Sequence, residues 1–93
     1  MAEYILELYV SRGDPTTVAA GAERARAAAE ELTAEGTHVR YVRAIFVPED
    51  ETCFFLYEAG SADAVREAAA RAGLGAERVT EALGAWREEQ ACL

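Results

Sequence analysis

Residues 38–59 read HVRYVRAIFVPEDETCFFLYEA. Two runs rich in β-branched and aromatic residues flank the polar stretch Pro48-Glu49-Asp50-Glu51, and this pattern is a strong signal for strand, turn and strand. If Glu49 and Asp50 make the turn, residues at equal distances from it lie opposite each other and share one face of the sheet. The segment therefore predicts an antiparallel hairpin with a defined register.

This register separates two faces of the hairpin. One face carries the pairs Phe46–Cys53, Ala44–Phe55 and Val42–Tyr57. The other carries the pairs Ile45–Phe54, Arg43–Leu56 and Tyr41–Glu58. The first face is small and apolar, as a surface beneath helices should be. The second mixes charged and aromatic polar groups with large apolar side chains, so we look for function there.

The flanking regions supply a strand and two helices. Residues 3–10, EYILELYV, alternate as a strand that turns Tyr4, Leu6, Leu8 and Val10 to the helices and Glu7 and Tyr9 to the mixed face. Asp14-Pro15 predicts the start of a helix that ends at Gly36, with the apolar stripe Val18, Ala22, Ala25, Ala29 and Leu32. Ser61 predicts the cap of a second helix that buries Val65, Ala68, Ala69 and Ala72 and ends at Gly73.

Residues 76–83, AERVTEAL, fit two structures. Val79 and Leu83 are four residues apart, as on a helix, whereas Val79-Thr80 suits a strand. We predict a fourth strand, because it completes the order strand, helix, strand, strand, helix, strand. The remaining residues, 84–93, form a C-terminal tail that holds the only tryptophan, Trp86, and we expect the tail to pack on a neighbouring surface.

This order is that of the ferredoxin-like α+β fold, with one antiparallel four-stranded sheet and both helices on one of its faces. The 93 residues make a single domain, 1–93. The other face of the sheet would carry Ile5, Tyr41, Ile45, Phe54 and Leu56, which is too apolar to meet water comfortably. We therefore expect two copies to pack sheet to sheet as a dimeric α/β barrel with a chamber between them.

The composition of the chain limits the kinds of partner and the cellular location that we expect. The chain has 17 acidic and 9 basic residues and a net charge of −8, which disfavours nucleic acid. It has no apolar run long enough for a membrane span and no leader pattern. The two cysteines, Cys53 and Cys92, form no metal-type pair. We read both as reduced thiols and expect a cytoplasmic protein.

No catalytic motif is present: the sequence has no glycine-rich phosphate loop, no Cys-x-x-Cys pair and, with a single histidine, no His-x-x-x-His pair. What remains is the polar group on the mixed face: Glu7, Tyr9, Tyr41, Arg43 and Glu58. If Glu7 and Glu58 lie close together, Arg43, a divalent metal or a proton would have to compensate them. His38, before the second strand, is either a surface residue or a ligand for nickel, copper or zinc.

Three segments resemble a family of small bacterial proteins of the ferredoxin-like, dimeric barrel type, one member of which is described as nickel-binding. They are THVRYVRAIFVPEDETCFFLYEAGSADAVREAAARAGLGAERVTEA, EYILELYVSRGD and AAGAERARAAAEELTAEG. The resemblance implies a cytoplasmic homodimer that binds a divalent transition metal, nickel by preference. It carries over no ligand set. Other relatives often have a histidine in the second helix, where this chain has alanine.

Our leading hypothesis is a non-catalytic, nickel-binding homodimer with Glu7, His38 and Glu58 as metal ligands and Tyr9, Tyr41 and Arg43 as polar residues of the chamber. The alternative is a cofactor-independent oxygenase or cyclase acting on a hydrophobic substrate. There Glu58 or Glu7 would be the acid or base, and Arg43 would stabilise an oxyanion. A passive ligand-binding or interaction module is the third possibility.

Overall fold

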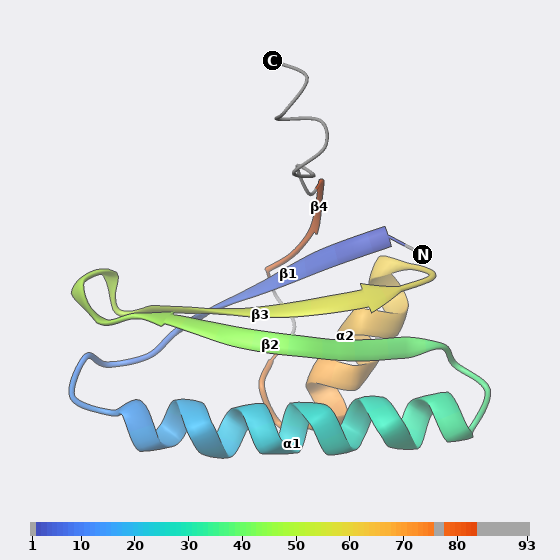
Figure 1. The fold of residues 1–93 in the computed structure, drawn as a ribbon, viewed down its shortest axis with the longest axis horizontal. Coiled ribbons are helices and arrows are strands. Elements are labelled where there is room, and N and C mark those ends of the chain that lie inside the picture. Colours follow the sequence, from blue (N-terminus) through green and yellow to red (C-terminus); the bar gives the residue numbers. More distant parts are fainter. Residues whose placement is uncertain (1, 76–77, 84–93) are drawn as a thin grey trace, which may run out of the picture.

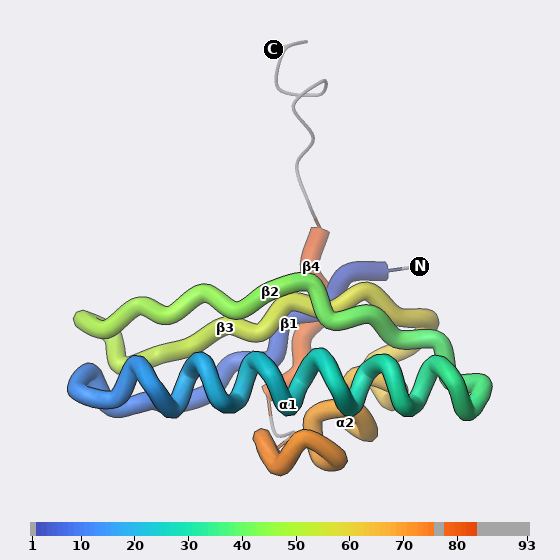
Figure 2. The backbone as a smooth tube through the Cα atoms, turned by 60° about the horizontal axis from the view of Figure 1, so that its bottom comes forward, coloured from blue at the N-terminus to red at the C-terminus, as the bar shows by residue number. Residues whose placement is uncertain are grey.

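The computed structural model describes residues 2–75 and 78–83. Its elements are β1 (Ala2–Tyr9), α1 (Pro15–Ala34), β2 (Val39–Val47), the short 3-10 helix η1 (Pro48–Asp50), β3 (Thr52–Ala59), α2 (Ala62–Arg71) and β4 (Val79–Ala82). The strands form one antiparallel sheet in the order β2-β3-β1-β4. Both helices lie on the same side of it (Figures 1 and 2). The predicted ferredoxin-like α+β fold is confirmed.

The fourth strand is also confirmed. Val79–Ala82 pairs with β1, with Ile5 opposite Thr80 and Glu3 opposite Ala82, so the helical alternative for this segment is wrong. Trp86 and the rest of the predicted tail lie outside the described residues.

Both helices begin and end where the sequence predicts. Pro15 is the first residue of α1, and Asp14 stands at the cap position, although its side chain makes no capping hydrogen bond. In α2 the Ser61 Oγ accepts a hydrogen bond from the Ala64 N–H at 3.2 Å. A glycine of positive φ stands two residues after the last residue of each helix, with φ of 106° at Gly36 and 74° at Gly73. Only glycine adopts this conformation without strain.

The core lies between the helices and one face of the sheet. The sheet contributes the large side chains, with Leu6, Phe55 and Tyr57 fully enclosed. The helices contribute mostly alanine, including Ala25, Ala29, Ala68 and Ala69. Small side chains let α1 approach closely, and a Cβ added at Gly21 would lie 3.3 Å from Leu74 and 3.5 Å from Phe55.

The hairpin register is as predicted near the turn and wrong beyond it. Phe46 lies opposite Cys53 and Arg43 opposite Leu56, but a β-bulge between Tyr41 and Arg43 then shifts the pairing by one residue. Tyr41 therefore lies opposite Tyr57, and Arg40 lies opposite Glu58. Because a bulge places an extra residue in one strand, every side chain beyond it changes face.

Candidate functional site

The open face is the side of the sheet turned away from both helices. Following the register across the strands gives three rows of side chains, which are Ile45–Phe54–Glu7, Arg43–Leu56–Ile5–Thr80 and Arg40–Glu58–Glu3–Ala82. The middle of this face is apolar, with Ile5, Phe54 and Leu56 half-buried and Ile45 41% exposed. Charged groups stand at both ends of the strands.

Four of the six predicted site residues lie on the open face. They are Glu7, Tyr9, Arg43 and Glu58, and Tyr9 is 75% exposed near the end of β1. Tyr41 does not lie there, which corrects the prediction that it is a polar residue of the chamber. The bulge turns its ring to the helix side, where it packs edge-on against Tyr57 at a centroid distance of 5.8 Å. Burial raises the pKa of Tyr41.

Glu7 and Glu58 are not neighbours within one chain. Glu7 lies opposite Phe54, and Glu58 is four residues further along β3, opposite Glu3. At the rise of a strand this separates the two carboxylate positions by about 13 Å. Within one chain the two carboxylates therefore do not lie close together, so the condition for a shared carboxylate site is not met in a single chain.

Each of these carboxylates already has an arginine partner. The Arg40 Nε donates to the Glu58 Oε1 at 3.0 Å, and the Arg78 Nη2 lies 3.4 Å from the Glu7 Oε1. Neither arginine was a predicted site residue. Arg43, the predicted partner, makes no ion pair with any residue in the described part of the chain. The sequence contained one signal for Arg40. In a regular strand Arg40 and Arg43 lie on opposite faces, so one of the two arginines would face the helices unless the strand has a bulge.

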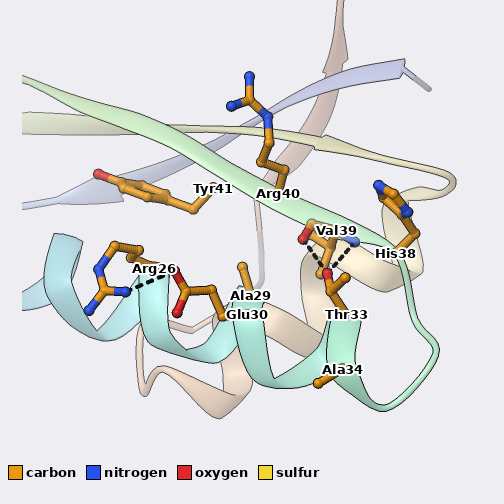
Figure 3. Close-up of a pocket in the computed structure, with 9 residues that line it drawn as sticks. All are labelled: Arg26, Ala29, Glu30, Thr33, Ala34, His38, Val39, Arg40 and Tyr41. Carbon is orange, nitrogen blue, oxygen red and sulfur yellow. Dashed lines mark hydrogen bonds and ion pairs between the residues drawn. The ribbon is translucent and has the colours of Figure 1, made fainter.

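His38 lies immediately before β2 and is exposed. Side chains two residues apart on an extended chain share a face, so His38 follows Arg40 and is a diagonal neighbour of Glu58. Figure 3 shows His38 and Arg40 both extending away from α1. Of the three predicted metal ligands, only His38 and Glu58 lie at the same end of the sheet.

One chain does not supply a complete metal site among residues 2–75 and 78–83. No three His, Cys, Asp or Glu side chains in these ranges are placed to hold an ion together. Cys53 is fully buried on the helix side, and this burial raises the pKa of its thiol, so it is a core residue as predicted.

The open face also carries a hollow of about 290 Å³ beside β4. Its apolar walls are Ile5, Val42, Leu56 and Leu83, and Leu83 is 91% exposed. Such a hollow is where a second sheet or an apolar ligand would find contacts. Neither helix within the described residues has the length and apolar character that crossing a bilayer requires.

Comparison with known proteins gives two matches. The crystal structure of SCO4226 from Streptomyces coelicolor A3(2) superposes with a TM-score of 0.70 at 27% sequence identity, covering 90% of this chain and 100% of that one. None of the curated proteins matches. The family described as "Nickel responsive protein SCO4226-like" matches residues 4–82, which include every strand and helix from Tyr4 onward. The chain therefore belongs to the SCO4226-like family of nickel-responsive proteins.

Proposed function

We propose that the chain binds a divalent transition metal, nickel by preference, as a non-catalytic homodimer closed through its open faces. The observation that carries this proposal is the apolar centre of the open face, which includes Ile5, Ile45, Phe54 and Leu56. An apolar surface of this kind normally has a partner. We propose a second copy of the chain as this partner, because it carries the same apolar face. The family assignment supports a role with nickel.

The two-fold symmetry of such a dimer would resolve the separation between Glu7 and Glu58. Consider a two-fold axis that lies between the two sheets and runs across the strands, along the row of Ile5 and Leu56. This axis reverses the strand direction of the second copy, so the Glu7 end of one sheet lies over the Glu3 and Glu58 end of the other. His38 stands at that same end. The proposed ligands are therefore Glu7 of one copy with Glu58 and His38 of the other, and Tyr9 and Arg43 line the chamber beside them.

Arginine competes with metal in this arrangement. Arg40 holds Glu58 and Arg78 holds Glu7, so a bound metal ion displaces one guanidinium from each carboxylate. Both pairs are partly exposed, and pairs of this type contribute only about 0–1 kcal/mol each. Imidazole is a ligand that suits nickel, so an ion that is also bound by His38 can displace these weak ion pairs.

Light scattering after gel filtration and nickel titration calorimetry test the proposal together. We expect a dimer of about twice the 10.0 kDa chain mass and saturable nickel binding. Glu58→Gln and His38→Ala should each weaken binding about tenfold or more, in line with the loss of one metal ligand. Glu81→Gln is the matched control, because Glu81 lies opposite Tyr4 on the other side of the sheet.

The substitution Leu56→Asp separates the two parts of the proposal. It places a charge in the apolar centre of each open face, so we expect a monomer that has lost nickel binding. A monomer that still binds nickel with unchanged affinity would exclude a shared site. A wild-type chain that is monomeric, or that takes up no nickel, would overturn the proposed function itself.

The hollow beside β4 favours a second candidate, a chamber that holds a small hydrophobic molecule. The 290 Å³ hollow would be enclosed by a second sheet, and Arg43 stands in the same row as Leu56. In an enzyme of this kind Glu58 or Glu7 would act as acid or base, and Arg43 would stabilise a developing oxyanion. Turnover of an apolar substrate that is lost in Arg43→Gln, without any dependence on nickel, would favour this candidate.

A further inference from the structure

The hollow beside β4 lies where the described residues end. Its apolar walls include Val42, Leu56 and Leu83, and Leu83 is the last residue that the structure describes. Beyond Leu83 the sequence continues with GAWREEQACL, residues 84–93. Trp86, the only tryptophan of the chain, is three residues further on, and three residues of extended chain span about 10 Å. The first large apolar side chain of this segment is therefore within reach of the hollow.

The register of the sheet explains why the hollow exists. Tyr4 and Tyr57 lie opposite each other and turn their side chains to the helices, so their backbone forms the floor of the hollow. Ala82 is too small to fill the space next to β4, and Val42, the extra residue of the bulge, forms another wall. At about 290 Å³ the hollow is slightly smaller than the roughly 300–1,000 Å³ of small-molecule sites, a size that suits one large side chain.

The charges around the hollow also match this segment. Glu3 lines the hollow, is exposed, and makes no ion pair with any residue that the structure describes. It lies opposite Glu58, and like charges directly opposite each other destabilise a sheet. In the sequence Arg87 directly follows Trp86, so an indole in the hollow brings a guanidinium within reach of Glu3.

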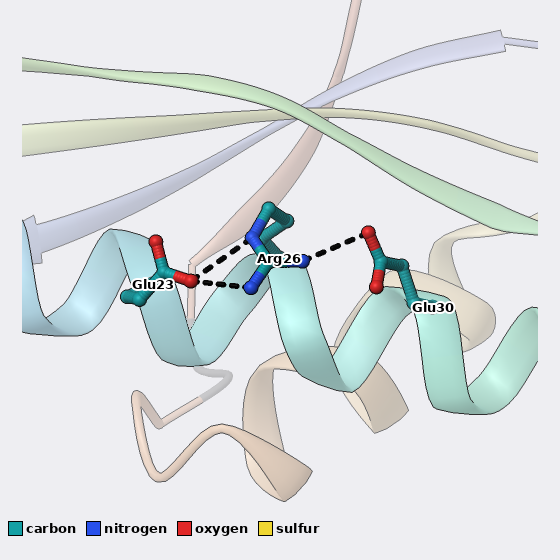
Figure 4. A network of polar contacts seen from close by, with 3 residues as sticks. All are labelled: Glu23, Arg26 and Glu30. Atoms are coloured by element: carbon teal, nitrogen blue, oxygen red, sulfur yellow. Dashed lines mark hydrogen bonds and ion pairs between the residues drawn. The ribbon is translucent and has the colours of Figure 1, made fainter.

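The hollow of about 430 Å³ between α1 and β2 suits the segment less well. It lies at the edge of the sheet opposite to β4, and three strand spacings of about 4.8 Å each separate the two edges, which is more than three residues span. Its rim carries Arg26, which is held by both Glu23 and Glu30 on the same helix (Figure 4). The acidic group at that rim therefore already has a cationic partner.

We propose that residues 84–93 fold back over the open face of their own chain, with the Trp86 indole in the hollow and the Arg87 guanidinium beside Glu3. Contact of the indole with Leu56 and the other apolar walls stabilises this arrangement, because aromatic side chains remove a large apolar area from water. The exposed ion pair adds little and mainly orients the segment. Neither nickel nor a second copy contributes an atom to this contact. A small apolar molecule enters the hollow only by displacing Trp86.

Fluorescence and NMR of the full chain test the contact, because Trp86 is the only tryptophan. We expect emission at a shorter wavelength and several-fold slower acrylamide quenching than in the urea-unfolded chain, with nuclear Overhauser contacts from the indole to the methyl groups of Val42 and Leu56. Val42→Asp should shift the emission to longer wavelength and make quenching several-fold faster. Ile45→Asp is the matched control, because Ile45 is similarly exposed on the same strand, 41% against 38%, but does not line the hollow.

These variants also separate the contact from the proposed dimer. Ile45→Asp places a charge in the apolar centre of the open face, so it should give a monomer in which Trp86 stays buried. Exposure of Trp86 in both variants would mean that a second sheet buries it, which would overturn the proposal. Emission of the native protein equal to that of the unfolded chain would also overturn it, as would indole contacts only to residues outside the hollow.

Binding of the hydrophobic dye anilinonaphthalene sulfonate gives a measurement that needs no charge in the hollow. The variants are made in the Ile45→Asp chain, so that a second sheet does not cover the hollow. Trp86→Ala empties the hollow, and dye fluorescence should rise several-fold. Tyr9→Ala, which removes an exposed aromatic side chain outside the hollow, should leave dye fluorescence unchanged. Equal dye binding with and without Trp86 would contradict the proposed contact.

Discussion

The Thr33 hydroxyl on α1 bonds both backbone groups of Val39, the first residue of β2. Edge strands expose unpaired N–H and C=O groups and are sites where other chains add strands. The threonine on α1 therefore blocks the beginning of β2 as well as tying helix to sheet.

Replacing Thr33 with the isosteric valine tests this role. Thr33→Val removes both hydrogen bonds, and we expect the free energy of unfolding to fall by about 1–2 kcal/mol in urea denaturation. Aggregation on standing should also rise, because the groups of Val39 become available. Thr17→Val, on the same helix, is the control, since its hydroxyl bonds no other described residue. Equal effects of the two substitutions would contradict the proposed role.

The two helix caps predict unequal losses. Ser61 caps α2 through a 3.2 Å hydrogen bond, whereas Asp14 makes no side-chain bond at the start of α1. Ser61→Ala should therefore cost about 1 kcal/mol of unfolding free energy, and Asp14→Ala less than about 0.5 kcal/mol. Chemical denaturation of both variants measures the difference, and a larger loss for Asp14→Ala would show that the Asp14 side chain does cap α1.

The Tyr57 hydroxyl is buried without a hydrogen-bond partner among the described residues. An unsatisfied buried hydroxyl costs free energy, so Tyr57→Phe should leave stability unchanged or raise it by up to about 1 kcal/mol. The ring contact with Tyr41 is kept in this variant. Thermal and urea unfolding measure the effect, and a loss above about 1 kcal/mol would mean that the hydroxyl is bonded after all.

Burial also raises the pKa of Tyr57 far above its ordinary value, and the charge of Tyr41 adds to this. Above about pH 10 the unfolded chain releases the tyrosine proton while the folded chain retains it, so stability is complete below that pH and falls as the pH rises beyond it. We expect a loss of about 1 kcal/mol between roughly pH 9.5 and pH 11 that Tyr57→Phe removes. An identical alkaline decline in both proteins, measured by urea denaturation at each pH, would assign it to other groups.

Gly21 tests how closely α1 packs. Alanine adds about 1 kcal/mol of helix propensity, and its Cβ would meet the flexible end of Leu74 at 3.3 Å, which a small movement relieves. Gly21→Ala should therefore be neutral or slightly stabilising. Gly21→Val also presses on Phe55 and should cost about 1–3 kcal/mol. Denaturant unfolding of the two variants gives the comparison, and a stable valine variant would show that the helix is free to move outward.

The sequence predicted the fold well because its local signals agree. Alternation in β1, the glycines that end both helices and the polar turn at Pro48 each favour the element that forms there. Residues near the turn also have the predicted register, since a turn determines the pairing closest to it.

The candidate site was predicted less well, and the bulge explains much of the error. Propensity is similar for Tyr41 and Val42, so counting from the turn could not reveal an extra residue between Tyr41 and Arg43. The separation of Glu7 from Glu58 depends on how β1 is aligned with β3, which no turn connects directly. The spacing of Arg40 and Arg43 was the one available signal of the shift.

The core is divided between strands with large side chains and helices rich in alanine, so its two layers tolerate different kinds of substitution. On the sheet side, where Phe55 and Tyr57 fill the space, trimming a side chain leaves a void. On the helix side, where Ala25 and Ala68 are fully buried, the damaging change is substitution by a larger side chain. Variants of this chain that survive selection should therefore keep small residues in the helix layer and large residues in the sheet layer.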